Sequence, residues 1–253
     1  MAVSLVCLGS AADLATASDA PMAEAVKSRD TVAVLALLEQ GADVNAPQAD
    51  GATALHWAVY WNSTDTADLL VRAGANVDAA NDLGVTPLWL ASTHQDAALV
   101  TRLLDAGADP NAAGAGYTAL HAAVLRGELE AVEALLLHGA EPNVRLERGT
   151  PGRRASEDWI LKARYVSATP FWLAAHFREP EIMRALAEGG ADPSLTTTEF
   201  WRSVGERAGG AGPPEVIGGF VTPIMAAVQG TSDRARFVTT SPDPVREERL
   251  ALE

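Results

Sequence analysis

The sequence contains few of the residues on which several large classes of protein depend. Its single cysteine, Cys7, cannot form an internal disulfide, and no cluster of cysteines and histidines offers the ligands of a structural zinc ion. No apolar run approaches the roughly 20 residues of a membrane-spanning helix. Basic residues number 19 against 33 acidic ones, and the net charge of −14 argues against binding to nucleic acids or anionic membranes.

Apolar residues, in contrast, are plentiful. Hydrophobic residues make up 48% of the 253 residues and charged residues 21%, which is enough to build a buried core and excludes a globally disordered chain. The length corresponds to one or two ordinary domains or to one elongated array.

The first 21 residues differ from the rest of the chain. Residues 2–12 are mostly apolar or small, and Ala15-Thr16-Ala17 has the form of a signal-peptide cleavage site, but the first basic residue is Lys27. Two interpretations stay open. Residues 1–21 are either the remnant of a truncated signal peptide, which predicts a periplasmic or secreted protein, or a flexible N-terminus of a cytoplasmic one.

One short phrase occurs five times, and its typical forms are Thr-Ala-Leu-His and Thr-Pro-Leu-Trp. It begins at Thr53, Thr86, Thr118, Thr169 and Thr222. A second phrase, Gly-Ala followed by Asp, Asn or Glu, recurs in step with the first. The first two intervals between the threonines are 33 and 32 residues, and the last two are 51 and 53. This periodicity predicts a repeat architecture with a unit near 33 residues.

Each part of the unit has a structural meaning. The threonine is a helix N-cap, and the proline that often follows it suits the first helical position. A second helix ends in Leu-Leu, which offers an apolar ridge, and the next glycine suits a left-handed C-terminal cap. Because one short helix pair cannot bury its own apolar face, we expect the pairs to stack on one another.

These phrases resemble the ankyrin repeat over roughly residues 22–230. The resemblance implies an all-α solenoid of stacked helix-turn-helix units with β-hairpin or turn fingers between them. We expect an ankyrin repeat domain over residues 22–253 with about five to six repeats, of which residues 22–38 form a shorter first pair. The long intervals predict finger insertions at residues 145–168 and 195–221, as in a bacterial-type array. The chain ends without a final Leu-Leu ridge, so we expect the last repeat to be incomplete.

The residues with catalytic potential have structural explanations. His56 and His121 lie in the repeat phrase, where we expect them to form hydrogen bonds between adjacent turns. Trp89, Trp172 and Met225 occupy the same position, so an imidazole is not chemically required there. No nucleophile with a base, no carboxylate pair and no open metal site stands out. We therefore predict no catalytic residue, no metal, no cofactor and no enzyme activity.

The resemblance also implies that a partner would contact the finger tips and the exposed end of the first helix of each repeat. The matching positions are Asp50, Tyr60, Trp61, Asp82, His94, Tyr117, Arg126, His176 and Phe177. The aromatic side chains could instead fill gaps between repeats, as we expect of Trp57. Arg153 and Arg154 of the first insertion could hold an acidic partner or the acidic body of the same chain.

The function implied by the resemblance is a non-catalytic scaffold that binds another protein through its concave face and fingers. We expect a monomer. The alternatives are a structural or inhibitory, immunity-like partner protein and a regulatory module of an enzyme. Residues 1–144 contain 18 acidic and five basic side chains, whereas residues 145–253 contain 15 and 14. This difference predicts a bipolar binding surface, acidic at one end and arginine-bearing at the other.

Overall fold

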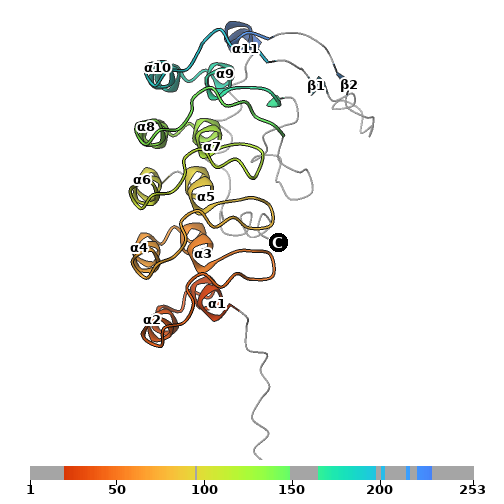
Figure 1. Cartoon of the computed structure of the whole chain (residues 1–253). Coiled ribbons are helices and arrows are strands. Elements are labelled where there is room, and N and C mark those ends of the chain that lie inside the picture. Colours follow the sequence, from red (N-terminus) through yellow and green to blue (C-terminus); the bar gives the residue numbers. More distant parts are fainter. Residues whose placement is uncertain are drawn as a thin grey trace, which may run out of the picture.

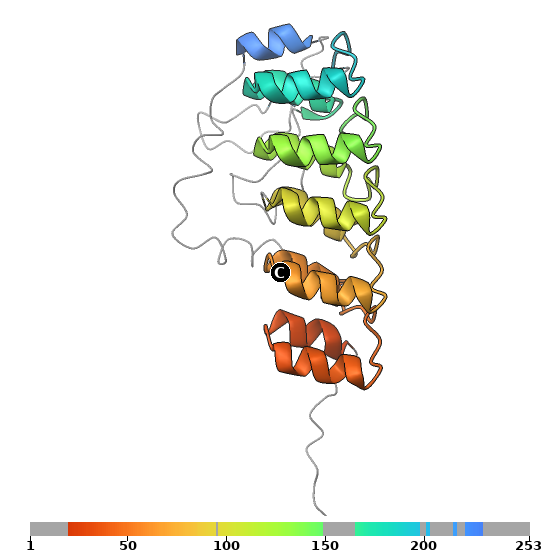
Figure 2. The same cartoon turned by 90° about the vertical axis from the view of Figure 1, so that its left-hand side faces the viewer.

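The structure is a computed structural model and describes residues 20–94, 96–148, 165–197, 201–202, 215–216 and 221–229. Within these ranges the helices form successive pairs that stack along one axis (Figure 1). The first helices of the pairs form an inner column, and the second helices form an outer column that faces the viewer in Figure 2. The all-α repeat solenoid predicted from the sequence is confirmed.

The helix boundaries follow the repeat phrases. The inner helices are α1 (Pro21–Lys27), α3 (Ala54–Tyr60), α5 (Pro87–Thr93), α7 (Ala119–Arg126), α9 (Pro170–Phe177) and α11 (Pro223–Gln229). The outer helices are α2 (Thr31–Glu39), α4 (Thr64–Arg72), α6 (Ala97–Asp105), α8 (Leu129–Leu137) and α10 (Pro180–Glu188). Two short strands, β1 (Trp201–Arg202) and β2 (Glu215–Val216), pair antiparallel within the second predicted insertion.

The predicted capping chemistry is present at both ends of the helices. Thr86 and Thr169 each accept a hydrogen bond from the backbone N–H three residues later, at 3.2 Å. The glycine of each Gly-Ala phrase has a positive φ, between 71° and 93°, which a residue without a Cβ adopts at little cost. These local signals fix where each helix begins and where the chain turns away from it.

The core runs through the whole stack. Leu55, Leu88, Leu120 and Leu173 project from four inner helices and are all at most 1% exposed. The outer helices bury one side only, as Leu70 of α4 illustrates at 0% exposure. Because each inner helix packs against the neighbouring inner helices of the stack, each repeat is stabilised mainly by its neighbours.

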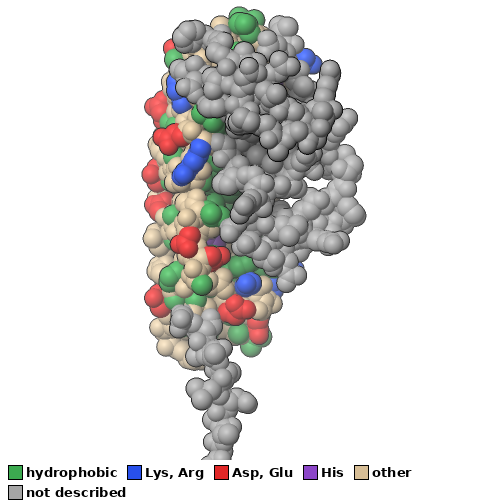
Figure 3. All heavy atoms as spheres, turned by 90° about the vertical axis from the view of Figure 1, so that its right-hand side faces the viewer, with side chains coloured by type: hydrophobic (Ala, Val, Ile, Leu, Met, Phe, Trp, Pro, Cys, Tyr) green, Lys and Arg blue, Asp and Glu red, His purple; other side chains and the backbone are tan. Residues whose placement is uncertain are grey.

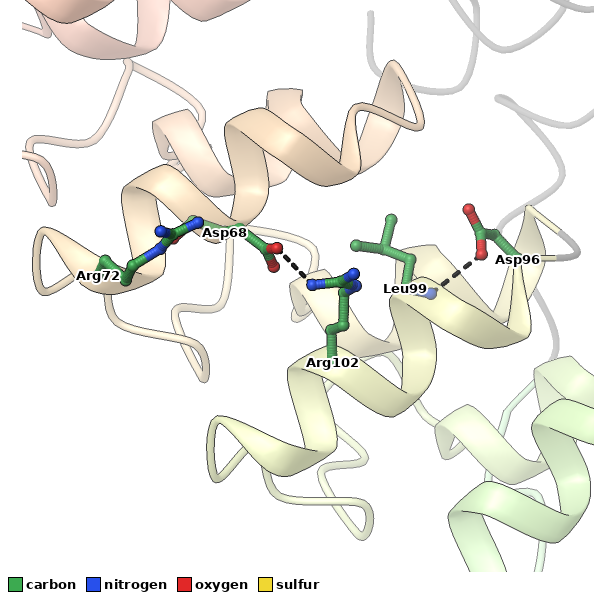
Figure 4. A network of polar contacts seen from close by, with 5 residues as sticks. All are labelled: Asp68, Arg72, Asp96, Leu99 and Arg102. Carbon is green, nitrogen blue, oxygen red and sulfur yellow. Dashed lines mark hydrogen bonds and ion pairs between the residues drawn. The ribbon is translucent and has the colours of Figure 1, made fainter.

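Polar contacts also link neighbouring outer helices. The Arg102 guanidinium of α6 donates to the Asp68 carboxylate of α4, and Asp96 caps α6 by accepting the Leu99 N–H at 3.0 Å (Figure 4). Arg72 donates to the backbone carbonyl of Asp68 at 3.2 Å. Solvent-exposed ion pairs of this kind contribute little stability, so the packing of the helices dominates.

The turns that follow the outer helices form a ladder of side-chain to backbone hydrogen bonds. Asn45 accepts from the N–H of Asn76 at 2.7 Å and donates to the Gly74 carbonyl at 3.0 Å. Asn111 and Asn143 repeat the same pair of bonds two and three units further on. This ladder holds the finger side of consecutive repeats at a constant spacing.

Both predicted insertions leave the helical stack intact. The first closes at its base, where the Ser167 N–H donates to the Leu146 carbonyl at 2.7 Å and the Leu146 N–H donates to the Ala168 carbonyl at 2.9 Å. At the second, the Thr197 N–H donates to the Val221 carbonyl at 3.2 Å. Arg153, Arg154, residues 1–19 of the predicted N-terminal segment 1–21 and the expected end of the last repeat lie outside the described residues, whereas Ala20 is buried and Pro21 begins α1. The domain limits 22–253 therefore stay a prediction.

Candidate functional site

The repeat-phrase histidines are structural residues. Nδ1 of His56 accepts the Thr53 backbone N–H at 3.2 Å, so the ring proton lies on Nε2, which donates to the Val85 carbonyl of the next repeat at 3.0 Å. Burial lowers the pKa of His56 below its usual 6.5, with the Val85 carbonyl and Asp50 opposing this effect. The predicted hydrogen bond between adjacent turns is confirmed for His56.

The same position is used differently in the later repeats. Nδ1 of His121 lies 2.8 Å from the Thr118 hydroxyl, while its Nε2 faces the Ala168 and Val144 carbonyls without a hydrogen bond of good geometry. Burial lowers the pKa of His121 to about 4. Trp172 replaces the imidazole with an indole, which donates to the Val221 carbonyl at 3.0 Å. His56 and Trp172 thus each place a neutral donor on a carbonyl of the next repeat, whereas the Trp89 indole at the same position has no hydrogen-bond partner among the described residues.

The finger tips of the first two full repeats lie side by side. The Asp82 N–H donates to the Asp50 carbonyl at 2.9 Å, and the Asp50 carboxylate accepts the Ala52 N–H at 3.0 Å. Asp82 is exposed and Asp50 is half-buried. Figure 3 shows acidic side chains at intervals along one edge of the stack. The tips of these two fingers are therefore in direct contact, and each carries an acidic side chain.

At the other end of the inner helices, four rings form an aromatic cluster that consists of Trp57, Tyr60, Trp61 and His94. The centroid of Tyr60 lies 5.5 Å from Trp57, 4.9 Å from Trp61 and 6.1 Å from His94, each in an edge-to-face arrangement. Edge-to-face geometry is the favoured packing of aromatic quadrupoles. Burial and the nearby charge of Arg126 lower the pKa of His94 to about 4, so its ring is neutral at pH 7.

Two cations of the first repeat lie on this aromatic cluster. The Lys27 ammonium is 4.8 Å from the centroid of Trp57, and the Arg29 guanidinium is 5.1 Å from that of Trp61. The Trp61 indole donates to the Lys27 carbonyl at 3.1 Å, which fixes the turn after α1 against α3. Both cationic residues are exposed, and Trp61 is half-buried. Figure 3 shows basic, acidic and hydrophobic side chains close together at this end of the stack.

The Trp57 indole is fixed by a second set of contacts. It donates to Gln48 Oε1 at 2.7 Å, and Gln48 Nε2 in turn donates to Glu24 at 3.0 Å. This chain of bonds joins the first finger to α1 and α3. The ring of Trp57 thus has one orientation, with Lys27 on its face.

A second group of rings surrounds the end of α9. His176 stacks on Trp172 with centroids 5.3 Å apart and meets Phe177 edge to face at 5.1 Å. The Tyr165 hydroxyl lies 3.3 Å from Nε2 of His176, and the Tyr165 ring is buried beneath the group. His176 and Phe177 are half-buried, so part of each ring lies at the surface.

The structure therefore divides the predicted site residues into three groups. Asp50 and Asp82 share the finger edge, Tyr60, Trp61 and His94 share the aromatic cluster, and His176 and Phe177 lie at the end of α9. Tyr60 and Tyr117 are only 3% and 5% exposed, so both side chains lie beneath the surface. The ring centroid of Tyr117 lies 5.4 Å from that of Trp89. Arg126 is half-buried. Direct contact with a partner stays a prediction for all of these residues.

Sequence reasoning missed Lys27 and Arg29. The first helix pair lacks the threonine phrase, so its positions were not aligned with those of the later repeats. Counting from the helix ends places Lys27 at the position of Tyr60, and Arg29 at that of Asn62, and both Arg29 and Asn62 have a positive φ. Extending the repeat register backwards through α1 would have identified this pair.

The described residues contain no group of three or more histidine, cysteine or acidic side chains that could hold a metal ion. None of the helices in the described ranges has the length and apolar character that crossing a membrane requires. What the described part of the chain offers chemically is acidic side chains at two finger tips and a partly exposed aromatic cluster that carries Lys27 and Arg29.

Comparison with known proteins supports the repeat assignment. A sequence model that describes ankyrin repeats in three copies matches residues 3–81 and 74–145. The chain is 36% identical over 178 residues to the ankyrin repeat domain-containing protein SAT10 of Stachybotrys chartarum. The aligned region covers 69% of this chain and 8% of that protein. It is 37% identical over 107 residues to the putative palmitoyltransferase ZDHHC13 of Danio rerio, covering 42% and 17%. It is 34% identical over 174 residues to the mitochondrial disaggregase of Bos taurus, covering 67% and 26%.

Proposed function

The chain belongs to the ankyrin repeat family, and we propose that it is a non-catalytic scaffold that binds a protein partner through its inner-helix ends and fingers. Ankyrin repeats generally mediate protein–protein interactions and are generally non-catalytic. The chain spans 8%, 17% and 26% of the three relatives named above. The enzymatic names among them describe those whole proteins and are not transferred to this chain.

The partially exposed aromatic side chains on a rigid frame carry this proposal. Trp61, His94 and Phe177 lie at equivalent inner-helix ends in three different repeats, and each is half-buried. Aromatic side chains of this kind dominate the energetics of protein interfaces because they bury a large area and lose little rotamer freedom. The stacked repeats hold the three side chains in place before a partner arrives, which lowers the entropic cost of binding.

Affinity purification with the full chain as bait tests the proposal. A partner identified by mass spectrometry is purified and its affinity measured against wild type, Trp61→Ala and Phe177→Ala. We expect each variant to weaken binding at least about tenfold, as is usual for a central aromatic contact. Arg72→Ala on the outer helix α4 is the matched control and should bind like wild type. The proposal fails if folded Trp61→Ala and Phe177→Ala bind the partner with unchanged affinity.

A structural role is the alternative, and exposed apolar residues at the two ends of the described stack favour it. Val32 of α2 is 77% exposed, and Ile224 of α11 is 78% exposed. A structural array would associate with itself end to end, whereas the proposed binder is a monomer with an open inner face. Sedimentation velocity over a range of concentrations separates these roles, because only self-association makes the sedimentation coefficient rise with concentration.

The location of the protein is a separate proposal. If residues 1–21 contain part of a signal peptide, the protein is periplasmic or secreted, and otherwise it is cytoplasmic. Fractionation of cells that express the native gene, followed by N-terminal sequencing, decides between these locations. The disulfide-free composition is compatible with both.

A further inference from the structure

We propose that Lys27 and Arg29, each lying on a tryptophan ring, form a binding site for the carboxylates of an acidic segment of the partner protein. This inference rests on the proposed function, because it specifies the chemistry of the partner at one part of the same surface. The cation pair, as we call Lys27 and Arg29, consists of the last residue of α1 and a residue of the turn between α1 and α2. The rings beneath it, Trp57 and Trp61, come from α3 and its C-terminal cap.

The cation pair is built on one rigid aromatic frame. Tyr60 contacts both Trp57 and Trp61 edge to face, so the two indoles that carry the cations share a buried central ring. The indole nitrogen of Trp61 is bonded to the Lys27 carbonyl and that of Trp57 to Gln48. Neither indole can turn without breaking a hydrogen bond, so the two rings on which the cations lie have fixed orientations.

Both charges lack a carboxylate partner within the described part of the chain. The nearby acidic side chains accept hydrogen bonds from other groups, because Glu24 accepts from Gln48 and Asp30 caps α2 by accepting the Ala33 N–H. Arg102, in comparison, pairs with Asp68 across the outer helices. Lys27 and Arg29 are therefore two exposed cations with capacity for additional hydrogen-bond acceptors.

The equivalent turn of a later repeat shows what a purely structural arginine does. Arg178 has the same left-handed backbone conformation as Arg29, with φ of 59° in both. Its Nε donates to the backbone carbonyl of Ala227 in the following repeat at 3.2 Å. Arg29 instead places its guanidinium over the Trp61 ring, 5.1 Å from the centroid, and a guanidinium carries five N–H donors.

The physical chemistry of this arrangement favours a carboxylate. A cation held on a ring has already lost part of its side-chain freedom, so pairing with an anion costs less entropy than at a mobile lysine or arginine. The net charge of −14 repels an acidic partner at long range, but salt screens this repulsion beyond roughly 8 Å at physiological ionic strength. Contact pairing then decides, and the half-buried Trp61 offers apolar surface to residues that flank the acidic ones.

The test is a selection from a library of random short peptides displayed against the full-length protein. Enriched peptides should contain two or more acidic residues next to an aromatic or aliphatic one. Their affinities are then measured by fluorescence anisotropy for wild type, Lys27→Met and Arg29→Met, which keep the apolar stem and remove the charge. We expect each substitution to weaken binding about tenfold, the effect of losing one charge-assisted hydrogen bond. Lys27→Arg should retain most of the affinity.

Three controls make the result specific. Replacing the acidic residues of an enriched peptide by their amides should weaken binding to wild type but not further weaken binding to the double Met variant. Arg72→Met, which removes a charge from the outer helix α4, should leave the affinity unchanged. Thermal melts of all variants establish that the loss of binding is not a loss of folding.

The outcomes separate this inference from the proposed function. If the enriched peptides lack acidic residues, or bind the double Met variant as tightly as wild type, the carboxylate site is wrong, and loss of their binding to Trp61→Ala or Phe177→Ala still supports the scaffold. If no peptide is enriched, the purified protein partner is used instead, and its affinity is measured for wild type and for the double Met variant. Equal affinities for the two proteins would overturn the proposed carboxylate site. If wild type binds neither peptide nor protein, both proposals fail.

Discussion

The carboxylate of Asp78 accepts a hydrogen bond from the backbone N–H of Asp109 at 2.8 Å. Asp78 occupies the ladder position that Asn45, Asn111 and Asn143 occupy in the other described repeats. Each asparagine forms two bonds to the following repeat, one as acceptor from an N–H and one as donor to a glycine carbonyl. An ionised aspartate has no donor, so the ladder has one bond fewer at this step.

We therefore predict that Asp78→Asn stabilises the protein. The new amide should donate to the Gly107 carbonyl, and one additional hydrogen bond is worth about 1 kcal/mol. The midpoint of thermal unfolding should rise by roughly 2–4 °C for a chain of this size. Differential scanning calorimetry of both proteins under identical conditions measures the shift.

The reverse substitution is the matched control. Asn111→Asp removes the donor to the Gly139 carbonyl and should lower the midpoint by a similar amount. If Asp78→Asn and Asn111→Asp shift the midpoint in the same direction, neither the gain and loss of a ladder bond nor the change in charge explains the shifts. The account of the ladder would then be incorrect.

Acid should destabilise the fold through its buried histidines. The pKa of His121 is about 4 in the folded state because burial penalises the charged ring, whereas its ordinary value is 6.5. Between these values the unfolded chain binds more protons than the folded one, so stability is fully present above pH 6.5 and is lost as the pH falls towards 4. For this fully buried ring the loss is about 3 kcal/mol by linkage. His94 should contribute with the same sign.

Urea unfolding at several pH values measures this dependence. His121→Gln should be less stable than wild type at neutral pH, but its stability should fall less steeply between pH 6.5 and 4. His138 is the control of opposite sign, because its two ring nitrogens face the Ala134 carbonyl and Asp105, and these acceptors raise its pKa. The stability that His138 contributes is present below pH 6.5 and is lost as the pH rises through the raised pKa. If stability falls as steeply with pH in His121→Gln as in wild type, the acid sensitivity does not come from His121.

The close approach of two fingers predicts a different effect for two otherwise similar glycines. Gly84 and Gly41 both have a positive φ, 75° and 71°. A Cβ on Gly84 would lie 2.2 Å from the carbonyl carbon of Gly114 in the next finger, whereas a Cβ on Gly41 meets nothing within 4 Å. Gly41→Ala should cost only the strain of the left-handed conformation, roughly 1–2 kcal/mol. Gly84→Ala should cost distinctly more, because the backbones must also separate.

Urea midpoints of the two variants give this comparison directly. Amide hydrogen exchange should also show faster exchange at Asn81 and Gly116, whose N–H groups are bonded within the two fingers, in Gly84→Ala but not in Gly41→Ala. Equal destabilisation by the two substitutions would mean that the fingers are not packed against each other in solution.

Much of the fold could be predicted because its determinants are local. The threonine phrase predicts where an inner helix begins, and α3 starts at Ala54, directly after Thr53. Residues 22–38 predicted a first helix pair, and the structure has α1 and α2 there. Capping residues and a 33-residue period are legible in a sequence because each depends only on neighbouring residues and on spacing.

The candidate site was harder to predict because exposure depends on contacts between repeats. Tyr60 and Tyr117 belong to the positions from which a partner surface was expected, yet neighbouring rings and helices bury both. The contacts of Lys27 and Arg29 with tryptophans join residues about one repeat apart, and no local pattern encodes them. Position in the repeat predicts where a side chain begins, and packing decides how much of it reaches the surface.

Arg145 connects the bases of the two insertions, and its removal should loosen both. Its Nη1 lies 2.8 Å from the Ser167 carbonyl, 3.1 Å from the Ser167 hydroxyl and 2.7 Å from the Thr196 carbonyl. Ser167 holds a left-handed conformation with φ of 74°, which a non-glycine residue adopts only when its surroundings stabilise it. The half-buried guanidinium is the only described side chain that contacts both insertion bases through hydrogen bonds.

We predict that Arg145→Met lowers the free energy of unfolding by about 2–4 kcal/mol, because it leaves the partly buried Ser167 and Thr196 carbonyls without their charged donor. The effect should be local: hydrogen exchange should accelerate at Ser167, Ala168 and Thr197, while amides of α3 and α5 keep their protection. Arg184→Met on the exposed side of α10 removes the same charge and should change stability by less than about 0.5 kcal/mol. Equal effects of these two substitutions, or uniform acceleration of exchange along the whole stack, would show that Arg145 does not join the insertions to the array.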